Sequence, residues 1–195
     1  DCVRIKYHVV VIMTVMNEEK DIVALFDFDG VVMDTETQYT VFWDEVGKEY
    51  FPEIPSYGRH IKGQTLMQIY DKYFPGKVEL QAQLTERLNR FEEQMHFDFI
   101  PGVVDFMKEL RLKGVKMAIV TSSNNLKMEK AFRAHPELHV LVDRILTADM
   151  FVHSKPHPEC FLLGATVFNT TPENCVVFED SFHGLEAARR AGMKI

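Results

Sequence analysis

The fold is decided by residues 22–35, which read IVALFDFDGVVMDT. A short apolar run ends there in two carboxylates, Asp27 and Asp29, followed by Gly30. Such a run is typical of a β-strand that is buried on both faces. Because an unpaired carboxylate inside a buried strand is costly, we expect both aspartates at the strand's carboxyl end.

Asp27 and Asp29 are separated by one residue, so their side chains can point the same way along an extended chain. Gly30 allows the backbone to turn sharply after them. Two like charges this close favour a cation, and a divalent metal with oxygen ligands is the simplest partner. An ordinary polar loop after a strand would show the same pattern, so the rest of the chain must separate the two interpretations.

The composition suits a globular protein with one full core and room for a small second domain, since the chain has 195 residues, 46% of them hydrophobic. A net charge of −7 disfavours a nucleic-acid partner. Cys2, Cys160 and Cys175 contain no C-x-x-C pair, which favours free thiols in a reducing compartment such as the cytoplasm.

Residues 9–16 form an apolar run after Arg4 and Lys6, but no A-x-A-like cleavage site follows. The run is also shorter than the roughly 20 apolar residues of a membrane-spanning helix. We therefore expect no membrane partner. Met16 reads like a start just before the first strand, and we predict that residues 1–15 are an extension outside the fold.

Residues 35–99 have helical periodicity and predict a small bundle of three helices. Pro52, Pro55 and Gly58 mark a loop after the first helix, and the second ends near Pro75 and Gly76. The apolar positions that define the helices are Tyr39, Phe42, Trp43 and Val46, then Leu66, Ile69 and Tyr70, then Leu80, Leu84, Leu88, Phe91 and Met95.

From residue 100 the chain alternates between helices and strands. Helices are predicted at 103–112, 124–134, 158–168 and 185–191, and strands at 115–120, 144–147 and 176–178. This alternation predicts an α/β fold with a parallel sheet and helices on both faces. Lys194 and Ile195 look like the start of one more strand, and we predict that an edge strand beyond them is missing.

Three polar clusters follow predicted strands or precede helices. Residues 121–125, TSSNN, open a helix, where hydroxyls and free N–H groups can bind an anion, although a plain N-cap by Ser123 or Asn124 is equally compatible. Lys155 is flanked by prolines that stiffen its segment, whereas a lone lysine is usually solvated. Glu179 and Asp180 end the last strand as paired acids. The nearby histidines, His153 and His157, are expected to cap or pack.

Residues 27–36, DFDGVVMDTE, resemble the first motif of the haloacid dehalogenase superfamily of phosphotransferases. The S-K-P-x-P around Lys155 resembles the third motif, and residues 176–192 resemble the fourth motif with its helix. With residues 121–125, all four motifs occur in order over residues 20–195. The helices of residues 35–99 resemble the mobile cap of the β-phosphoglucomutase-like branch.

This resemblance implies a Rossmann-like core of residues 16–34 and 100–195 and a helical cap of residues 35–99. It implies that Asp27 attacks phosphorus and becomes an aspartyl-phosphate. Asp29 would protonate the leaving oxygen and later deprotonate the hydrolytic water. We therefore expect a phosphatase of a small phosphorylated metabolite, acting as a monomer.

The resemblance also implies Mg²⁺ as the cofactor. Its ligands would be Asp27, Asp180 and the backbone carbonyl of Asp29, with Glu179 binding directly or through water. The phosphate would be bound by Thr121, Ser122 and Lys155, and we expect Asn125 to contact the substrate.

Three alternatives stay open. Dehalogenation needs no acid for an alcohol, so Asp29 favours phosphoryl transfer. Mutases of this branch carry a histidine where this chain has Tyr39, and an arginine soon after a K-G pair. Here Lys62-Gly63 has no such arginine after it, although Arg59 could take its role. A non-catalytic binding protein is disfavoured by the intact motifs.

Overall fold

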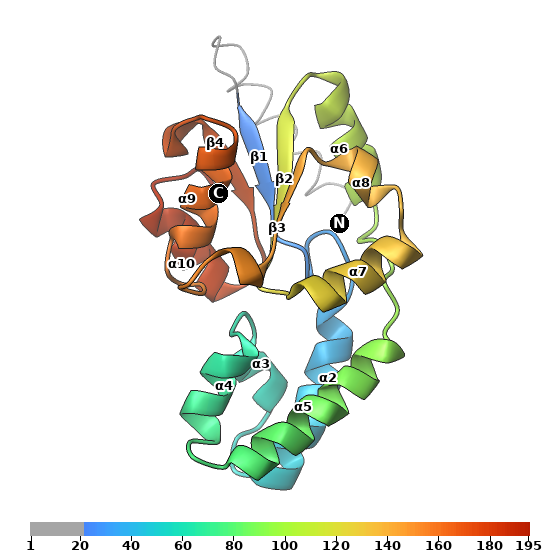
Figure 1. The fold of residues 1–195 in the computed structure, drawn as a ribbon, viewed down its shortest axis with the longest axis vertical. Helices are drawn as coiled ribbons and strands as arrows, with labels where there is room; N and C mark the ends of the chain where they lie inside the picture. The colour runs from blue at the N-terminus through green and yellow to red at the C-terminus, as the bar shows by residue number, and fades with distance from the viewer. Residues whose placement is uncertain (1–21) are drawn as a thin grey trace.

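The computed structural model describes residues 22–195, and the predicted extension at residues 1–15 lies outside them (Figure 1). At its centre is a parallel sheet in the order β3-β2-β1-β4. The strands are β1 Val23–Phe26, β2 Lys116–Val120, β3 Arg144–Leu146 and β4 Cys175–Phe178. This confirms the predicted α/β class and places each strand within one residue of its predicted bounds at either end.

Helices cover both faces of the sheet, and the alternation of strand side chains explains why (Figure 1). Ala24 and Phe26 point to one face, where the buried cluster includes residues of α6, α7 and α8. Val23 and Leu25 point to the other, where the cluster includes residues of α9 and α10. These helices are α6 Val103–Leu112, α7 Asn125–Ala134, α8 Leu138–Leu141, α9 Glu159–Val167 and α10 Phe182–Arg190, and two short 3₁₀ helices are η1 Ala148–Met150 and η2 Pro172–Asn174.

Lys194 begins another parallel pairing beside β4, as the sequence predicted. It forms an isolated bridge with Val176, and its carbonyl accepts a hydrogen bond of 2.8 Å from the Val177 N–H. The sheet therefore has β3 at one edge and this short pairing at the other.

Four helices form a separate part beyond the carboxyl ends of the strands (Figure 1). They are α2 Glu36–Tyr50, α3 Tyr57–Ile61, α4 Leu66–Tyr73 and α5 Val78–Glu93. We call them the helical part. Their apolar side chains pack into their own buried cluster. Treating this part as a mobile cap stays a prediction.

Two details of the helical part differ from the sequence prediction. The segment predicted as a loop contains α3, whose Tyr57 is almost completely buried and packs among the aromatic rings of the bundle. Met95 was predicted to lie on the third helix, but α5 ends at Glu93 and Met95 packs into the cluster of the sheet. Helical spacing alone could not show that the chain turns back toward the sheet at that point.

The chain enters and leaves the helical part through two segments that pair with each other. Met33 forms an antiparallel bridge with Phe99. The Asp34 N–H donates to the Asp98 carbonyl at 2.8 Å, and the Ile100 N–H donates to the Val32 carbonyl at 3.0 Å. The segment that enters the helical part and the segment that leaves it are thus hydrogen-bonded to each other. No helix within residues 22–195 is both long and apolar enough to cross a bilayer.

Candidate active site

A cavity of about 240 Å³ lies between the carboxyl ends of the strands and the helical part. Loops after three strands line it with Asp27, Ser122 and Glu179, and the segment before α9 contributes Lys155. The helical part closes the other side with residues that include Tyr39 and Lys62. Residues that are far apart in the sequence therefore meet here, as expected for the carboxyl edge of a parallel sheet.

Lys155 holds two carboxylates at the floor of this cavity. Its Nζ donates to Asp27 Oδ1 at 2.9 Å and to Glu179 Oε1 at 2.7 Å, and only 2% of the lysine is exposed. Asp27 follows β1 directly, and its N–H donates to the Phe178 carbonyl at 2.9 Å, which extends the pairing with β4. The sheet thereby fixes the direction of the Asp27 side chain.

Burial dominates the electrostatics of this group. It raises the pKa of Asp27 well above the ordinary value, and the nearby Glu179 and Asp29 act in the same direction, against Lys155. The two carboxylates raise the pKa of Lys155 despite its burial, so the ammonium stays charged. The surplus of negative charge around Asp27 thus favours a further cation.

The carboxylates can supply that cation with ligands. Oxygens of Asp27, Glu179 and Asp180 lie within 4.8 Å of one another. A set of carboxylate oxygens is what Mg²⁺ prefers, so these residues fit the predicted metal. Gly30 makes room for them, because it has a φ of +78° and a Cβ there would lie 2.2 Å from Asp180 Oδ2.

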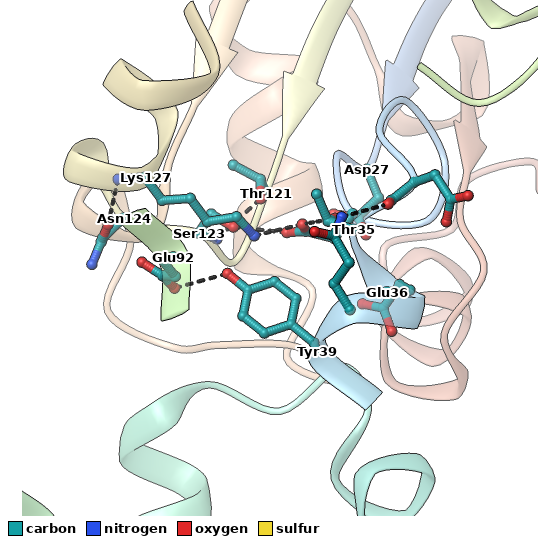
Figure 2. A network of polar contacts seen from close by, with 12 residues as sticks. Asp27, Thr35, Glu36, Tyr39, Glu92, Thr121, Ser123, Asn124 and Lys127 are labelled. Carbon is teal, nitrogen blue, oxygen red and sulfur yellow. Dashed lines mark hydrogen bonds and ion pairs between the residues drawn. The ribbon is translucent and has the colours of Figure 1, made fainter. Parts of the chain in front are cut away.

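Three donors hold the side chain of Asp29. Its Oδ1 accepts from the Thr35 hydroxyl and from Lys127 Nζ, and its Oδ2 accepts from the Ser123 hydroxyl at 2.8 Å. Figure 2 shows Thr35, Ser123 and Lys127 converging from three separate segments. Lys127 and the hydroxyls lower the pKa of Asp29 although burial opposes this, so the free protein holds Asp29 as a carboxylate.

Of the two hydroxyl residues predicted to bind phosphate, Ser122 lines the cavity and Thr121 does not. Ser122 lines the cavity, and its hydroxyl is buried without a hydrogen-bond partner within residues 22–195. Such an orphaned hydroxyl is a suitable donor for a phosphate oxygen. Thr121 is fully buried outside the cavity lining, and its Oγ1 accepts from the Ser123 N–H at 3.0 Å. The Thr121 side chain therefore shapes the loop.

Asn125, which we expected to contact the substrate, is not brought to the cavity. Its Oδ1 accepts a hydrogen bond of 2.8 Å from Thr147, and its N–H donates to Asp149. Asn124 takes the N-cap position of α7, where its side chain accepts from the Lys127 N–H. The alternative interpretation of residues 121–125 as a helix cap is thus confirmed for Asn124. Ser122, Ser123 and Asn124 also line the cavity.

The histidines beside Lys155 lie at an exposed turn. His153 donates its backbone N–H to Glu159, and its Nδ1 lies 2.7 Å from the same carboxylate. The ring of His157 packs against that of His153, with 4.4 Å between their centres. These contacts agree with the expectation that the two histidines cap or pack. Together with Glu159, their ring nitrogens also lie close enough to hold a metal ion.

Sequence reasoning missed several residues of the cavity. Lys62 of the helical part bridges Asp180, at 2.6 Å, and Glu36, at 3.5 Å. Nothing in the sequence signals this, because the partners are far apart. For Lys127 a signal existed: the lysine shares the buried face of its helix with Met128 and Ala131, where a solvated lysine would not lie.

Glu36 gives a prediction that depends on pH. Burial raises its pKa to about 7, although Lys62 acts in the opposite direction. Between pH 4.5 and 7 the folded protein keeps a proton on Glu36 that the unfolded chain has released, so the free energy of unfolding falls over this range and levels off above pH 7. In EDTA, Glu36→Gln should raise the free energy of unfolding by about 2 kcal/mol at pH 8 relative to its effect at pH 5.

Denaturant unfolding at the two pH values measures this difference. Glu45→Gln, an exposed substitution on the same helix, is the matched control and should show no such dependence. An equal effect of Glu36→Gln at both pH values would contradict the prediction.

The family model described as haloacid dehalogenase-like hydrolase matches residues 24–195, so the chain belongs to this family and is an enzyme of the hydrolase class. Among curated relatives, fructose-1-phosphate phosphatase YqaB of Escherichia coli is 32% identical, over 87% of this chain and 92% of its own. The phosphorylated carbohydrates phosphatase of Thermotoga maritima is 30% identical, over 88% and 82%.

Mutases are similar as well. The β-phosphoglucomutase of Bacillus subtilis is 26% identical, over 87% of this chain and 80% of its own. The crystal structure of β-phosphoglucomutase from Clostridium difficile superposes with a TM-score of 0.73 over 89% of this chain and 82% of its own. At 23% identity that likeness concerns the fold alone.

Proposed function

We propose that the protein is a Mg²⁺-dependent phosphatase of a small monophosphorylated metabolite, of the sugar-phosphate kind. The observation that carries this proposal is the meeting of Asp27, Asp29, Lys155 and Asp180 around one cavity of about 240 Å³. The phosphatases of E. coli and T. maritima, at 32% and 30% identity, support the same reaction.

In the first step an oxygen of Asp27 attacks phosphorus, and the bond from phosphorus to the leaving oxygen breaks. Asp29 gives that oxygen a proton, which it acquires when the arriving phosphate dianion raises its proton affinity. In the second step Asp29 takes a proton from water, whose oxygen attacks phosphorus and releases inorganic phosphate from Asp27. Lys155 and the Ser122 hydroxyl offset charge on the phosphate oxygens.

Asp27, Glu179 and Asp180 would hold Mg²⁺, and the resemblance adds the backbone carbonyl of Asp29. When bound, the ion neutralises charge on the phosphate and on the attacking carboxylate. Burial opposes the ionisation of Asp27, although the attack needs a carboxylate. The bound ion and Lys155 would together favour the ionised form.

The charges of the cavity favour a neutral leaving group. Within the part of the chain that the structure describes, every lysine that lines the cavity already faces a carboxylate. Arg59, the candidate anchor for a second phosphate, does not line it. The helical part lines the cavity with neutral polar side chains, and all but Asn89 of those named here already make hydrogen bonds within that part: Thr40, Gln64, Thr65, Thr85 and Asn89.

A β-phosphoglucomutase-type mutase is the second candidate, favoured by the similarity to the B. subtilis mutase. A mutase must bind a bisphosphate intermediate, whereas the carboxylate of Glu92 lies on the wall of this cavity. This charge balance is the reason for placing the phosphatase first.

The test is a panel of phosphate esters assayed for phosphate release with Mg²⁺ and with EDTA. Fructose 1-phosphate, glucose 6-phosphate and glycerol 3-phosphate should have kcat/KM values at least about tenfold above those of fructose 1,6-bisphosphate and phosphoglycolate, because one uncompensated like-charge contact costs about 1.4 kcal/mol.

Conversion of β-glucose 1-phosphate to glucose 6-phosphate without net phosphate release would favour the mutase. A folded protein that releases phosphate from no monophosphate in Mg²⁺ would refute the phosphatase.

A further inference from the structure

Lys127 is a charged side chain that is almost completely buried, with 3% of its surface exposed. Burying an ammonium is costly unless it is paired and hydrogen-bonded. The lysine lies in the first turn of α7, and its side chain extends away from the helix toward Thr35 and Tyr39, where it lines the cavity (Figure 2). Its partners there should therefore reveal why the position holds a lysine.

The ammonium of Lys127 lies between the sheet and the helical part. Its Nζ is 2.5 Å from Asp29 Oδ1 and 4.3 Å from the centre of the Tyr39 ring on α2. The Tyr39 hydroxyl donates to Glu92 Oε1 on α5 at 2.8 Å. Figure 2 shows the row from Lys127 through Tyr39 to Glu92. One charge thus connects Asp29 to two helices of the helical part.

The other donors to Asp29 differ from Lys127 in kind. Thr35 and Ser123 are short hydroxyl side chains that belong to the loops next to the site. Lys127 alone among the three carries a charge, and its contacts to Asp29 and Tyr39 lie on both sides of the cavity. All three hydrogen bonds are charge-assisted because Asp29 is ionised, but only the bond from Lys127 joins two opposite charges, which makes it the strongest contact to the carboxylate.

We propose that Lys127 is a positioning residue that holds the Asp29 carboxylate toward the leaving oxygen and, through Tyr39, ties that orientation to the position that α2 and α5 have in this structure. The inference rests on the proposed function, since it assigns Lys127 to the proton transfer of that reaction. The cation–π contact fits this role, because the Tyr39 ring stabilises the Lys127 ammonium at the point where it faces Asp29.

This role affects substrates unequally. A sugar monophosphate leaves as an alkoxide, so its departure needs the proton from Asp29. Acetyl phosphate leaves as acetate, a stable anion that needs no proton. Because kcat/KM reports the steps up to departure of the leaving group, a misplaced Asp29 should lower kcat/KM for the sugar phosphate only.

The experiment compares kcat/KM for fructose 1-phosphate, or the fastest monophosphate of the panel above, with kcat/KM for acetyl phosphate. In Lys127→Met the first value should fall about 10- to 100-fold, a part of the usual contribution of general acid catalysis, and the second by less than about threefold. Lys127→Gln, which can still donate a hydrogen bond to Asp29, should lie between. Lys130→Met on the same helix is the control and should change neither.

The ratio of the two values is measured on one protein sample, so a loss of folded protein cancels. Equal losses for both substrates, or no loss for either, would overturn the inference. If the unaltered enzyme releases phosphate from neither ester, the proposed function itself fails, which is a distinguishable result.

Discussion

Asp27→Asn is expected to lower phosphate release by about 10³-fold or more while leaving the fold intact. The amide has nearly the shape of the carboxylate but cannot attack phosphorus or form the covalent intermediate. The remaining charge of Lys155 still faces Glu179 at 2.7 Å. Because burial raises the pKa of Asp27, removing its charge should not lower the melting temperature measured in EDTA.

Steady-state phosphate release and thermal unfolding of the same sample test both halves of this prediction. Asp34→Asn, an exposed change in the same stretch, is the matched control and should keep full activity. An active Asp27→Asn variant would exclude Asp27 as the nucleophile. A variant that loses both activity and its folding transition would show a structural role instead.

Lys155→Met should have the second largest effect, on activity and on stability together. Without the ammonium, Asp27 and Glu179 face each other in a buried site, and the expected loss is about 3–5 kcal/mol of unfolding free energy. Phosphate release should fall about 10²- to 10³-fold, as when one preorganised electrostatic contact is removed.

The pH dependence of that loss has a definite sign. Lys155 lowers the pKa of Glu179 and opposes the rise for Asp27, so its removal raises both pKa values. A carboxyl group with a raised pKa keeps its proton up to a higher pH, so at pH 5 the two groups are more often neutral and repel each other less than at pH 8. The destabilisation in EDTA should therefore be smaller at pH 5 than at pH 8. Urea unfolding at both values measures this, with Lys108→Met on the exposed face of α6 as the control. A loss that does not depend on pH would contradict the proposed charge balance.

The sheet could be predicted from the sequence because its strands are continuous apolar runs. Residues 22–26 and 115–120 have no other reasonable interpretation, and the polar residues that follow them mark the strand ends. The short helix α3 could not be predicted, because Pro52, Pro55 and Gly58 are equally typical of a loop. What makes it a helix is packing, since Tyr57 becomes buried against Phe51 and Tyr73.

The residues of the site likewise fall into those that the sequence could predict and those that it could not. Asp27, Asp29, Lys155 and Asp180 each occur in a local motif, so the sequence could predict them before any contact was known. Their roles stay predictions that only the experiments above can test. Lys62 and Glu92 owe their place in the cavity to contacts over long stretches of chain, with Asp180 and with Tyr39. No local pattern encodes such pairs.

The paired segments at Met33 and Phe99 should allow the helical part to be replaced as a unit. Because the chain goes out and returns at one antiparallel bridge, the helices between these points can be exchanged for those of a relative without new ends crossing the sheet. Such a chimera would keep the strand ends that carry Asp27 and Lys155. Its choice of ester should then follow the donor of the transplanted helices.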